Sequence, residues 1–517
     1  MSIQQICRRI ILYLAVATLI VSMLGVACGG SDGDAGPGTG PPKYGGSLVV
    51  TLFADFFTLD PPLQINSAEI IVTQATYDNL VMVQPDLSLK PMLATHWEAS
   101  NDLASYTFHL RQGVKFHHGK DFKAEDVVST FTRLVDPELD SPARTTFNVI
   151  EEMVILDDYT VRFDLTAPNA FFPESLSVYQ ARIVPSDVDP ARLSLEEFGT
   201  GPFMITSHSP GEQTVMTRNP DYWETGRPYL DEVTVLLIPE PATRAEALKS
   251  GDVDVIFLLE ALSASGLDAH PDTVVSETAS SSYLGMYMNM DVEPFDNVLV
   301  RKAIQAATDR EAINQAALLG RGVIANDHPI PPNDPHFASQ YAPPDYDPEL
   351  ARSLLEQAGY PDGIDLTLYT SSAGAPLVEV AVAFKEMAAP AGIRVDIQRV
   401  GEDIFWTEVW LVKPFATVFW NGRPPDQALS IVYPSDANWN ESNYNNPTVD
   451  QLIVQARGQN LEERKATYGE IQRILIDEVP RTLVVFQPIL FGMRSDVRGL
   501  EAHPMSWLIL NDTWLDR

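Results

Sequence analysis

The chain has 517 residues, 45% of them hydrophobic, which is enough to bury more than one hydrophobic core. Its 35 basic and 70 acidic residues give a formal charge of −35, and a surface of this sign repels phosphate backbones, so nucleic acid is excluded as an expected partner. The two cysteines are Cys7 and Cys28, so the later part of the chain can form no disulfide and must be held by its cores. The length predicts two or three lobes.

The first residues predict an export signal at 1–27. Arg8 and Arg9 precede an apolar run from Ile10 to Ala27, and small residues follow Cys28. An uncleaved membrane anchor is the alternative, because about 18 apolar residues lie at the short end of what spans a bilayer. Residues 28–46 are rich in Gly and Pro and have no apolar periodicity, which predicts a flexible tether.

Strands are predicted where β-branched residues concentrate, at 47–53 and 231–238. The stretch 105–119 predicts a hairpin that turns near Gln112 and Gly113. Alternation would place Tyr106, Phe108 and Leu110 on one face of it.

Two helices have clear end signals. In 346–360, Asp347 suits the N-cap, Pro348 the first turn and Gly359 the end. The expected buried stripe of that helix is Leu350, Ala351, Leu354, Leu355 and Ala358. The stretch 242–257 predicts a helix that ends at Gly251, followed by a strand. Helix, glycine and strand in this order are typical of α/β lobes.

Ordered motifs along most of the chain match a known family. They are YGGSLVV with LDP (44–50, 59–61), LKPMLATHWE (89–98), YTFHLRQGVKFHHGKDFKAEDVV (106–128), GTGPF (199–203), RNPDYW (218–223), SGDVDV (250–255), YMNMDVEPFDNVLVRKAI (287–304) and DPELARSLLEQAGY (347–360). In their number and order they resemble the family 5 solute-binding proteins of bacterial ABC importers, the peptide, dipeptide and nickel type.

This resemblance implies an α/β fold of the periplasmic-binding-protein type (type II, cluster C), a clamshell of two α/β lobes with an inserted third domain. Lobe I would comprise 43–70, 191–285 and 481–517, the insert 71–190, and lobe II 286–480. Such proteins close around a ligand through hinge segments.

The resemblance also implies ligand-binding positions. In peptide-binding relatives the stretch matching Ala54–Phe57 is an edge strand that pairs with the ligand backbone, which makes Phe56 a candidate. The alternative is that Phe56 and Phe57 are core or lobe-interface aromatics. The crossing strand at 280–289 makes Ser281, Ser282 and Tyr283 candidates for ligand contact.

The stretch FWNGRPPDQALS (419–430) matches a loop that relatives write as Trp, small residue, Gly, Asp, where the acid anchors the α-amino group of a peptide. Here Trp420 is kept, but Arg423 stands at the position of the acid. We expect Arg423 either to bind an anionic group of the ligand or to pair with an acid of the lobe. Asp426 is a displaced anchor for an amine or the cap of a helix that starts near Gln427.

Trp439 and Asn440, in an Asn-rich stretch at 433–447, are candidates to line the cleft, with ordinary turn chemistry as the alternative. His117 and His118 are adjacent, so on a strand they would point to opposite faces, and we expect no protein-bound metal and no cofactor.

No familiar catalytic motif is present, so we do not expect an enzyme. The residues before Cys28 resemble a lipobox, which implies a lipid on Cys28 and attachment to the cell membrane, in the periplasmic space if the host has two membranes. Residue 25, where the family prefers Leu, is Gly.

The expected protein is a monomeric, extracytoplasmic lipoprotein that captures a peptide or peptide-like solute and delivers it to an ABC permease and ATPase complex. Alternatives are a binder of an opine, metal chelate or oligosaccharide with the same transport role, a peptide hydrolase, and an adhesin or extracytoplasmic chaperone.

Overall fold

The computed structural model describes residues 40–371 and 375–517. The expected export signal, Cys28 and the tether up to residue 39 lie outside the described residues. One compact unit, formed by Lys43–Leu515 and Arg517, contains all the elements given below. Among the described residues, no helix combines the length and apolar character needed to cross a membrane.

A seven-stranded mixed sheet is built from segments far apart in sequence. Its strands, in spatial order, are β12 (Thr273–Thr278), β19 (Ile489–Arg494), β11 (Val255–Ile256), β1 (Ser47–Leu52), β10 (Glu232–Leu237), β9 (Gln213–Arg218) and β8 (Phe203–Ser209). The central strand β1 runs parallel to both of its neighbours, β10 and β11. Both strands predicted from β-branched residues, β1 and β10, are confirmed.

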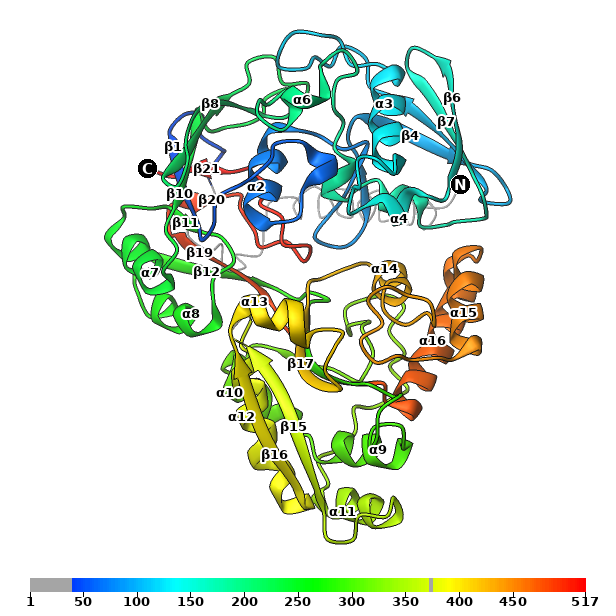
Figure 1. Ribbon diagram of the computed structural model, residues 1–517. Helices are drawn as coiled ribbons and strands as arrows, with labels where there is room; N and C mark the ends of the chain where they lie inside the picture. The colour runs from blue at the N-terminus through cyan, green and yellow to red at the C-terminus, as the bar shows by residue number, and fades with distance from the viewer. Residues whose placement is uncertain (1–39, 372–374) are drawn as a thin grey trace, which may run out of the picture. The chain divides into compact units, whose positions relative to one another are not determined.

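Helices cover both faces of this sheet because β1 is apolar on both sides. Leu48, Val50 and Leu52 pack with helix α2 (Ser67–Thr76). Val49 packs with the opposite cluster, which includes helices α7 (Pro241–Ser250) and α8 (Ala261–Asp268). Figure 1 shows α7 and α8 together beside β12 and β19. The predicted helix, Gly251 and strand are confirmed, with Gly251 in the left-handed conformation at φ 83°.

A six-stranded sheet lies in the second half of the chain. Its strands, in spatial order, are β14 (Val323–Ile324), β18 (Arg481–Phe486), β13 (Tyr283–Met288), β17 (Phe415–Trp420), β15 (Ile364–Ser371) and β16 (Ile393–Val400). Every residue of β13 and β18 is buried, as expected of central strands, whereas β15 alternates in its first half. Helices α9 to α16 accompany this sheet, and Figure 1 shows α15 and α16 side by side. Their bounds are α9 (Val298–Ala306), α10 (Arg310–Leu318), α11 (Pro348–Gln357), α12 (Leu377–Ala388), α13 (Glu402–Ile404), α14 (Pro425–Ser430), α15 (Pro447–Arg457) and α16 (Leu461–Glu478).

The expected lobe boundaries at 286 and 481 do not coincide with this sheet. Position 286 falls inside β13, and 481 is the first residue of β18, yet both strands belong to the six-stranded sheet. Residues 283–285 and 481–486 therefore share a sheet with strands from the range expected for lobe II.

A third, four-stranded sheet lies within the range expected for the insert. Its strands, in order, are β4 (Ala94–Ala99), β5 (Ser105–Leu110), β7 (Thr160–Leu165) and β6 (Ile150–Asp157). The helices of this region are α3 (Ala124–Val135), α4 (Arg144–Phe147), α5 (Phe172–Ser175) and α6 (Pro190–Leu193). Two small ladders join β2 (Val81–Val83) to β3 (Leu89–Pro91) and β20 (Val497–Arg498) to β21 (Trp514–Leu515). The single 3-10 turns are Pro61–Leu63, Tyr179–Ala181 and Ala389–Ala391, and a π turn spans Phe405–Val409.

The hairpin predicted at 105–119 is wrong. The buried face of β5 is as expected, with Tyr106, Phe108 and Leu110 inside, but its partners are β4 and β7. The prediction failed because the turn at Gly113 leads to a lone bridge between Lys115 and Asp121 rather than to a strand that pairs with β5.

The helix predicted after Asp347 is confirmed as α11. The Asp347 carboxylate accepts hydrogen bonds from the backbone N–H of Glu349 and Leu350, at 3.1 and 2.8 Å. Leu350, expected in the buried stripe, is instead exposed, because the helix packs on the side of Ala351 and Leu355.

Candidate functional site

The loop after β17 is fixed to the start of β13 by backbone contacts. The Ser281 hydroxyl donates to the Arg423 carbonyl and accepts from the Arg423 N–H, both at 2.8 Å. The Ser282 hydroxyl donates to the Trp420 carbonyl, also at 2.8 Å. A Cβ on Gly422 would lie 3.0 Å from the Pro504 carbonyl oxygen, so a side chain at this position would push the loop and Pro504 apart by a few tenths of an ångström. The loop is therefore held in place by Ser281 and Ser282 on one side and by contact with Pro504 on the other.

Trp420 belongs to a buried polar cluster. Its indole N–H donates to Glu441 at 3.2 Å, and the Trp410 indole donates to the same oxygen at 2.5 Å. Arg481 forms an ion pair with the second Glu441 oxygen at 2.7 Å, and both side chains are buried. The Tyr283 hydroxyl accepts from Arg481 at 3.0 Å. Trp420 and Tyr283 thus use their polar atoms inside the protein, as supports of the loop.

Ser282 and Phe56 are also engaged in packing. Ser282 is buried, and its hydroxyl is already bonded to Trp420. Phe56 stacks on His208 with ring centroids 4.3 Å apart and packs against the core of the seven-stranded sheet. Residues 54–57 form no strand, whereas Phe57 is 86% exposed. The contacts of Phe56 favour the core alternative stated above.

The Trp439 ring is 40% exposed and contacts Trp420 at 5.7 Å between centroids, so it offers a free aromatic surface. The Asn440 side chain closes a turn, since it accepts from the Tyr444 N–H at 2.9 Å and donates to the Tyr444 carbonyl at 2.8 Å. For Asn440 the structure therefore favours turn chemistry.

The Arg423 guanidinium has no acidic partner among the described residues. It lies over the Trp420 ring at 5.1 Å and donates to the Asn421 carbonyl at 3.1 Å. Burial lowers the pKa of Arg423 from its ordinary value. The alternative in which Arg423 pairs with an acid of the lobe is wrong for this structure. The guanidinium faces a cavity and can still receive an anionic group.

Asp426 does not cap a helix. Helix α14 begins at Pro425, one residue before Asp426, and its N-cap is Pro424. The Asp426 carboxylate instead pairs with Arg457 of α15 at 3.1 Å. Burial raises the pKa of Asp426, and the charge of Arg457 opposes that effect.

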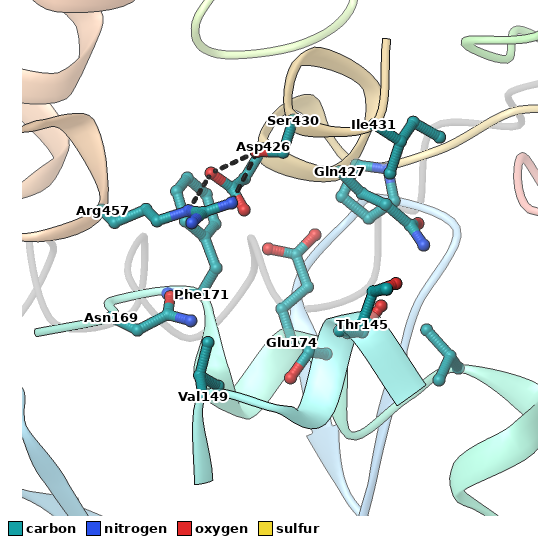
Figure 2. A pocket seen from close by; sticks show the side chains of 14 residues that line it. Thr145, Val149, Asn169, Phe171, Glu174, Asp426, Gln427, Ser430, Ile431 and Arg457 are labelled. Atoms are coloured by element: carbon teal, nitrogen blue, oxygen red, sulfur yellow. Dashed lines mark hydrogen bonds and ion pairs between the residues drawn. The ribbon is translucent and has the colours of Figure 1, made fainter. Parts of the chain in front are cut away.

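Two adjoining cavities surround this loop. One, of about 180 Å³, lies between α5 and α14, and its lining includes Thr145, Phe171, Glu174, Asp426, Gln427 and Arg457 (Figure 2). The other, of about 100 Å³, is lined by residues that include Leu87, Glu174, Ser281, Asp334, Arg423 and Pro504. The two cavities share Phe171, Glu174 and Pro424. Among the predicted residues, Ser281 and Arg423 line the second cavity and Asp426 lines the first.

Glu174 is the cavity residue that the sequence reasoning missed. It belongs to α5, and Figure 2 shows its carboxylate pointing toward α14. The Ala170 N–H donates to the Arg457 carbonyl at 2.8 Å, and Arg464 lies over the Phe171 ring at 4.1 Å. These contacts bring α5 to the loop. No local pattern around Glu174 indicates such a position, because it depends on a contact between segments almost 300 residues apart.

The adjacent histidines His117 and His118 both have protein partners. His117 bonds to Glu197 at 2.5 Å, and His118 bonds to Asp187 at 3.3 Å. A different group among the described residues, His96, Glu98 and His109, has ligand atoms within 4.8 Å of one another and could hold a metal ion. His96 and His109 are cross-strand partners on β4 and β5, a pairing that spacing along the sequence does not reveal.

Comparisons with known proteins assign this architecture. Residues 88–441 match the family described as bacterial extracellular solute-binding proteins, family 5 Middle. The chain belongs to family 5 of these proteins. It is 30% identical to heme-binding protein A of Haemophilus influenzae, over 96% of this chain and 97% of that protein. It is 28% identical to the glutathione-binding protein GsiB of Salmonella paratyphi A, over 90% of this chain and 94% of that protein.

Among solved structures, the family 5 chain is similar to the periplasmic binding protein DppA of Helicobacter pylori in complex with the peptide STSA. The TM-score is 0.81 and the identity 28%, with 92% of this chain and 99% of that chain covered. The family resemblance and the expected fold, a type II α/β clamshell of the periplasmic-binding-protein class, are confirmed.

Family 5 membership fixes the coarse role of the protein. It is an extracytoplasmic solute-binding protein of ABC importers, a class that binds small molecules or peptides and works with ABC permeases. Its relatives are transport proteins rather than enzymes. The ligand-binding roles expected from the sequence stay predictions.

Proposed function

We propose that this family 5 protein captures a peptide or peptide-like solute in the two cavities beside α14 and delivers it to a membrane permease. The observation that carries the proposal is the lining of the smaller cavity. It contains a guanidinium without an acidic partner, Arg423, and a carboxylate without a basic partner, Glu174, among the described residues. A solute with both an acid and an amine complements this pair of charges.

The ligand would act by shifting the protein toward its closed form. The smaller cavity is lined by Leu87 and Pro504 as well as by the loop at Arg423. A solute that touches all these segments is bound best when they are close together, so it favours closure by the difference between its affinities for the two forms. The permease then recognises the closed protein.

A non-peptide solute is the second candidate, and Arg423 favours it. The family resemblance implies an acid at this position in peptide-binding relatives, and a relative of similar length, heme-binding protein A, is named for a ligand that is not a peptide. Opines, metal chelates and oligosaccharides belong to this candidate. A hydrolase, an adhesin or a chaperone has no observation in its favour here.

We propose three lobes with boundaries adjusted to the sheets. Lobe I comprises residues 43–76, 191–282 and 487–517, the insert 77–190, and lobe II 283–486, so that α2 stays whole with the seven-stranded sheet on which it packs. The membership of β13 and β18 in the six-stranded sheet supports the change from the boundaries at 286 and 481.

We also propose that the protein is a monomer anchored by a lipid on Cys28. The sequence before Cys28 supports the anchor. Cys28→Ser is expected to move the protein from the membrane fraction to the soluble fraction and to abolish labelling by a palmitate analogue. Unchanged membrane attachment of Cys28→Ser would exclude this anchor.

The experiment that tests the ligand class is a titration followed by tryptophan fluorescence, because Trp439 is exposed and contacts Trp420 of the loop. The panel contains short peptides, opines and heme. A saturable change with short peptides supports the first candidate. A saturable change with opines or heme alone supports the second.

A further inference from the structure

Glu174 is a carboxylate that the protein brings to the loop and leaves without a partner. No hydrogen bond or ion pair reaches its carboxylate oxygens within the described residues, and the side chain lines both cavities. The residue is half-buried, and Figure 2 shows its carboxylate directed toward α14.

The neighbouring charges do not compensate Glu174. Burial raises its pKa to about 7, and the carboxylates of Asp334 and Asp426 act in the same direction. Arg464 opposes this effect, but its guanidinium lies over the Phe171 ring and forms no ion pair with Glu174. Arg457 is already paired with Asp426. A carboxylate kept in such a place costs folding free energy, and uncompensated charges of this kind concentrate at functional sites.

The groups around Glu174 suit a donor-rich cation. Figure 2 shows the side chains of Glu174, Asp426 and Gln427 around the same cavity, with the Thr145 hydroxyl beside them. An ammonium group has three N–H donors and no acceptor, so it can bond to the carboxylate and to the amide and hydroxyl oxygens at once. An anion entering the same cavity would meet two carboxylates and one arginine.

We propose that Glu174 is the residue that recognises a primary ammonium group of the transported solute. This inference rests on the proposed function and deepens it. The amine anchor would then come from α5 of the insert, while the loop position at 423 supplies the opposite charge. Loss of Glu174 would therefore remove the preference for amine-bearing solutes without removing the solute-binding fold.

The test is competitive capture from a defined mixture. The mixture contains short peptides, the same peptides with acetylated amino termini, and polyamines, all at equal concentrations. Purified wild-type protein, Glu174→Gln and Glu174→Asp each capture solutes from it, and mass spectrometry counts what is bound. Glu138→Gln is the matched control, because Glu138 is an exposed acid of the insert that does not line the larger cavity.

We expect wild-type protein and Glu138→Gln to enrich free-amine peptides over their acetylated forms by about tenfold or more, since one buried charge-assisted bond is worth at least that factor. Glu174→Gln should bring the ratio close to one, and Glu174→Asp should restore part of it. Equal capture of free and acetylated peptides by wild-type protein would overturn the role of Glu174 and leave the peptide-binding function standing.

Two further outcomes distinguish the proposed role of Glu174 from the proposed binding of peptides. Capture of polyamines alone, lost in Glu174→Gln, would support Glu174 as an ammonium site and reject a peptide ligand. Capture of nothing from the mixture would count against both. Thermal unfolding of each variant shows that a lost preference does not come from a misfolded protein.

Discussion

Glu174 and Arg423 line the same cavity, one from the insert and one from the loop after β17, and neither has an oppositely charged partner among the described residues. In a protein with 70 acidic and 35 basic residues, a solvent-shielded arginine without an acid is unexpected. The Arg423 guanidinium can therefore bind the acid group of a zwitterionic solute, and the Glu174 carboxylate can bind its amine.

Replacement of Glu174 by Gln should stabilise the ligand-free protein at high pH. The pKa of Glu174 is raised from 4.5 to about 7, so the folded state prefers the protonated form. The wild type therefore has its full stability at low pH and loses part of it as pH rises from 4.5 to 7. At pH 8 the variant should gain about 1 to 3 kcal/mol in free energy of unfolding, allowing for screening in the cavity.

This gain should vanish at about pH 3, well below the pKa of 4.5 in the unfolded chain, where Glu174 is protonated in both states. Thermal and urea unfolding of the two proteins at both pH values measure it. A variant that is less stable than the wild type at pH 8 would mean that Glu174 has a structural partner.

Removal of the Arg423 guanidinium should weaken binding of an identified acidic solute. Arg423 forms no ion pair with an acid among the described residues. Its replacement by Ala therefore removes a ligand contact without leaving a buried carboxylate unpaired. Arg423→Ala is expected to lower affinity by about tenfold to a hundredfold, and Arg423→Lys by less, because Lys lacks the planar fork.

Calorimetric titration measures this loss, with Arg399→Ala as the control, since Arg399 is an exposed arginine of β16. Unchanged affinity in Arg423→Ala would show that Arg423 does not touch the solute.

Sequence patterns were most informative where the cause of a structure is local. Asp347, Pro348 and Gly359 determine the ends of α11 within one segment, and the structure agrees. The hairpin at 105–119 failed because β5 pairs with β7, which begins at Thr160, and no nearby residue encodes that choice. Leu350 was misplaced because the hydrophobic pattern alone does not say which edge of the stripe meets the core.

In the candidate site, too, some residues could be predicted from local sequence and others could not. Arg423 could be found because the loop motif has a fixed spacing, and it does face a cavity. Tyr283 and Trp420 have the residue types of a binding site, but the buried Glu441 and Arg481 pair occupies their polar atoms. Glu174 could not be found, because its position depends on the contact between Ala170 and Arg457.

Removal of one partner from the buried Glu441 and Arg481 pair should strongly destabilise the protein. Both side chains are buried and 2.7 Å apart, so Arg481→Met would leave an unpaired carboxylate in the core. We expect a loss of about 3 to 5 kcal/mol in free energy of unfolding.

Urea denaturation measures the effect of Arg481→Met. Arg473→Met is the control, because the Arg473 side chain of α16 is 42% exposed and its ion pairs with Glu470 and Asp477 should contribute under about 1 kcal/mol. Equal losses in the two variants would contradict the importance of the buried pair.

Gly422→Ala should impair ligand binding more than stability. The added Cβ would lie 3.0 Å from the Pro504 carbonyl oxygen and 3.3 Å from the Ser281 hydroxyl, so the loop and Pro504 must separate by a few tenths of an ångström. Since Pro504 and Arg423 line one cavity, this movement should lower affinity by about tenfold.

Gly401→Ala is the matched control, because nothing lies within 4 Å of its added Cβ. Fluorescence titration of both variants with the identified solute measures the difference. Wild-type affinity in Gly422→Ala would mean that contact between the loop and Pro504 is not needed for binding.

The most direct test is to identify what the protein carries. Wild-type protein and the double variant Glu174→Gln, Arg423→Ala are purified from the native host and denatured, and the released small molecules are measured by mass spectrometry. The account predicts one solute class with both an amine and an acid group, released in near-equimolar amount by the wild type and strongly depleted in the double variant. Release of a solute without an amine, or equal release from both proteins, would contradict it.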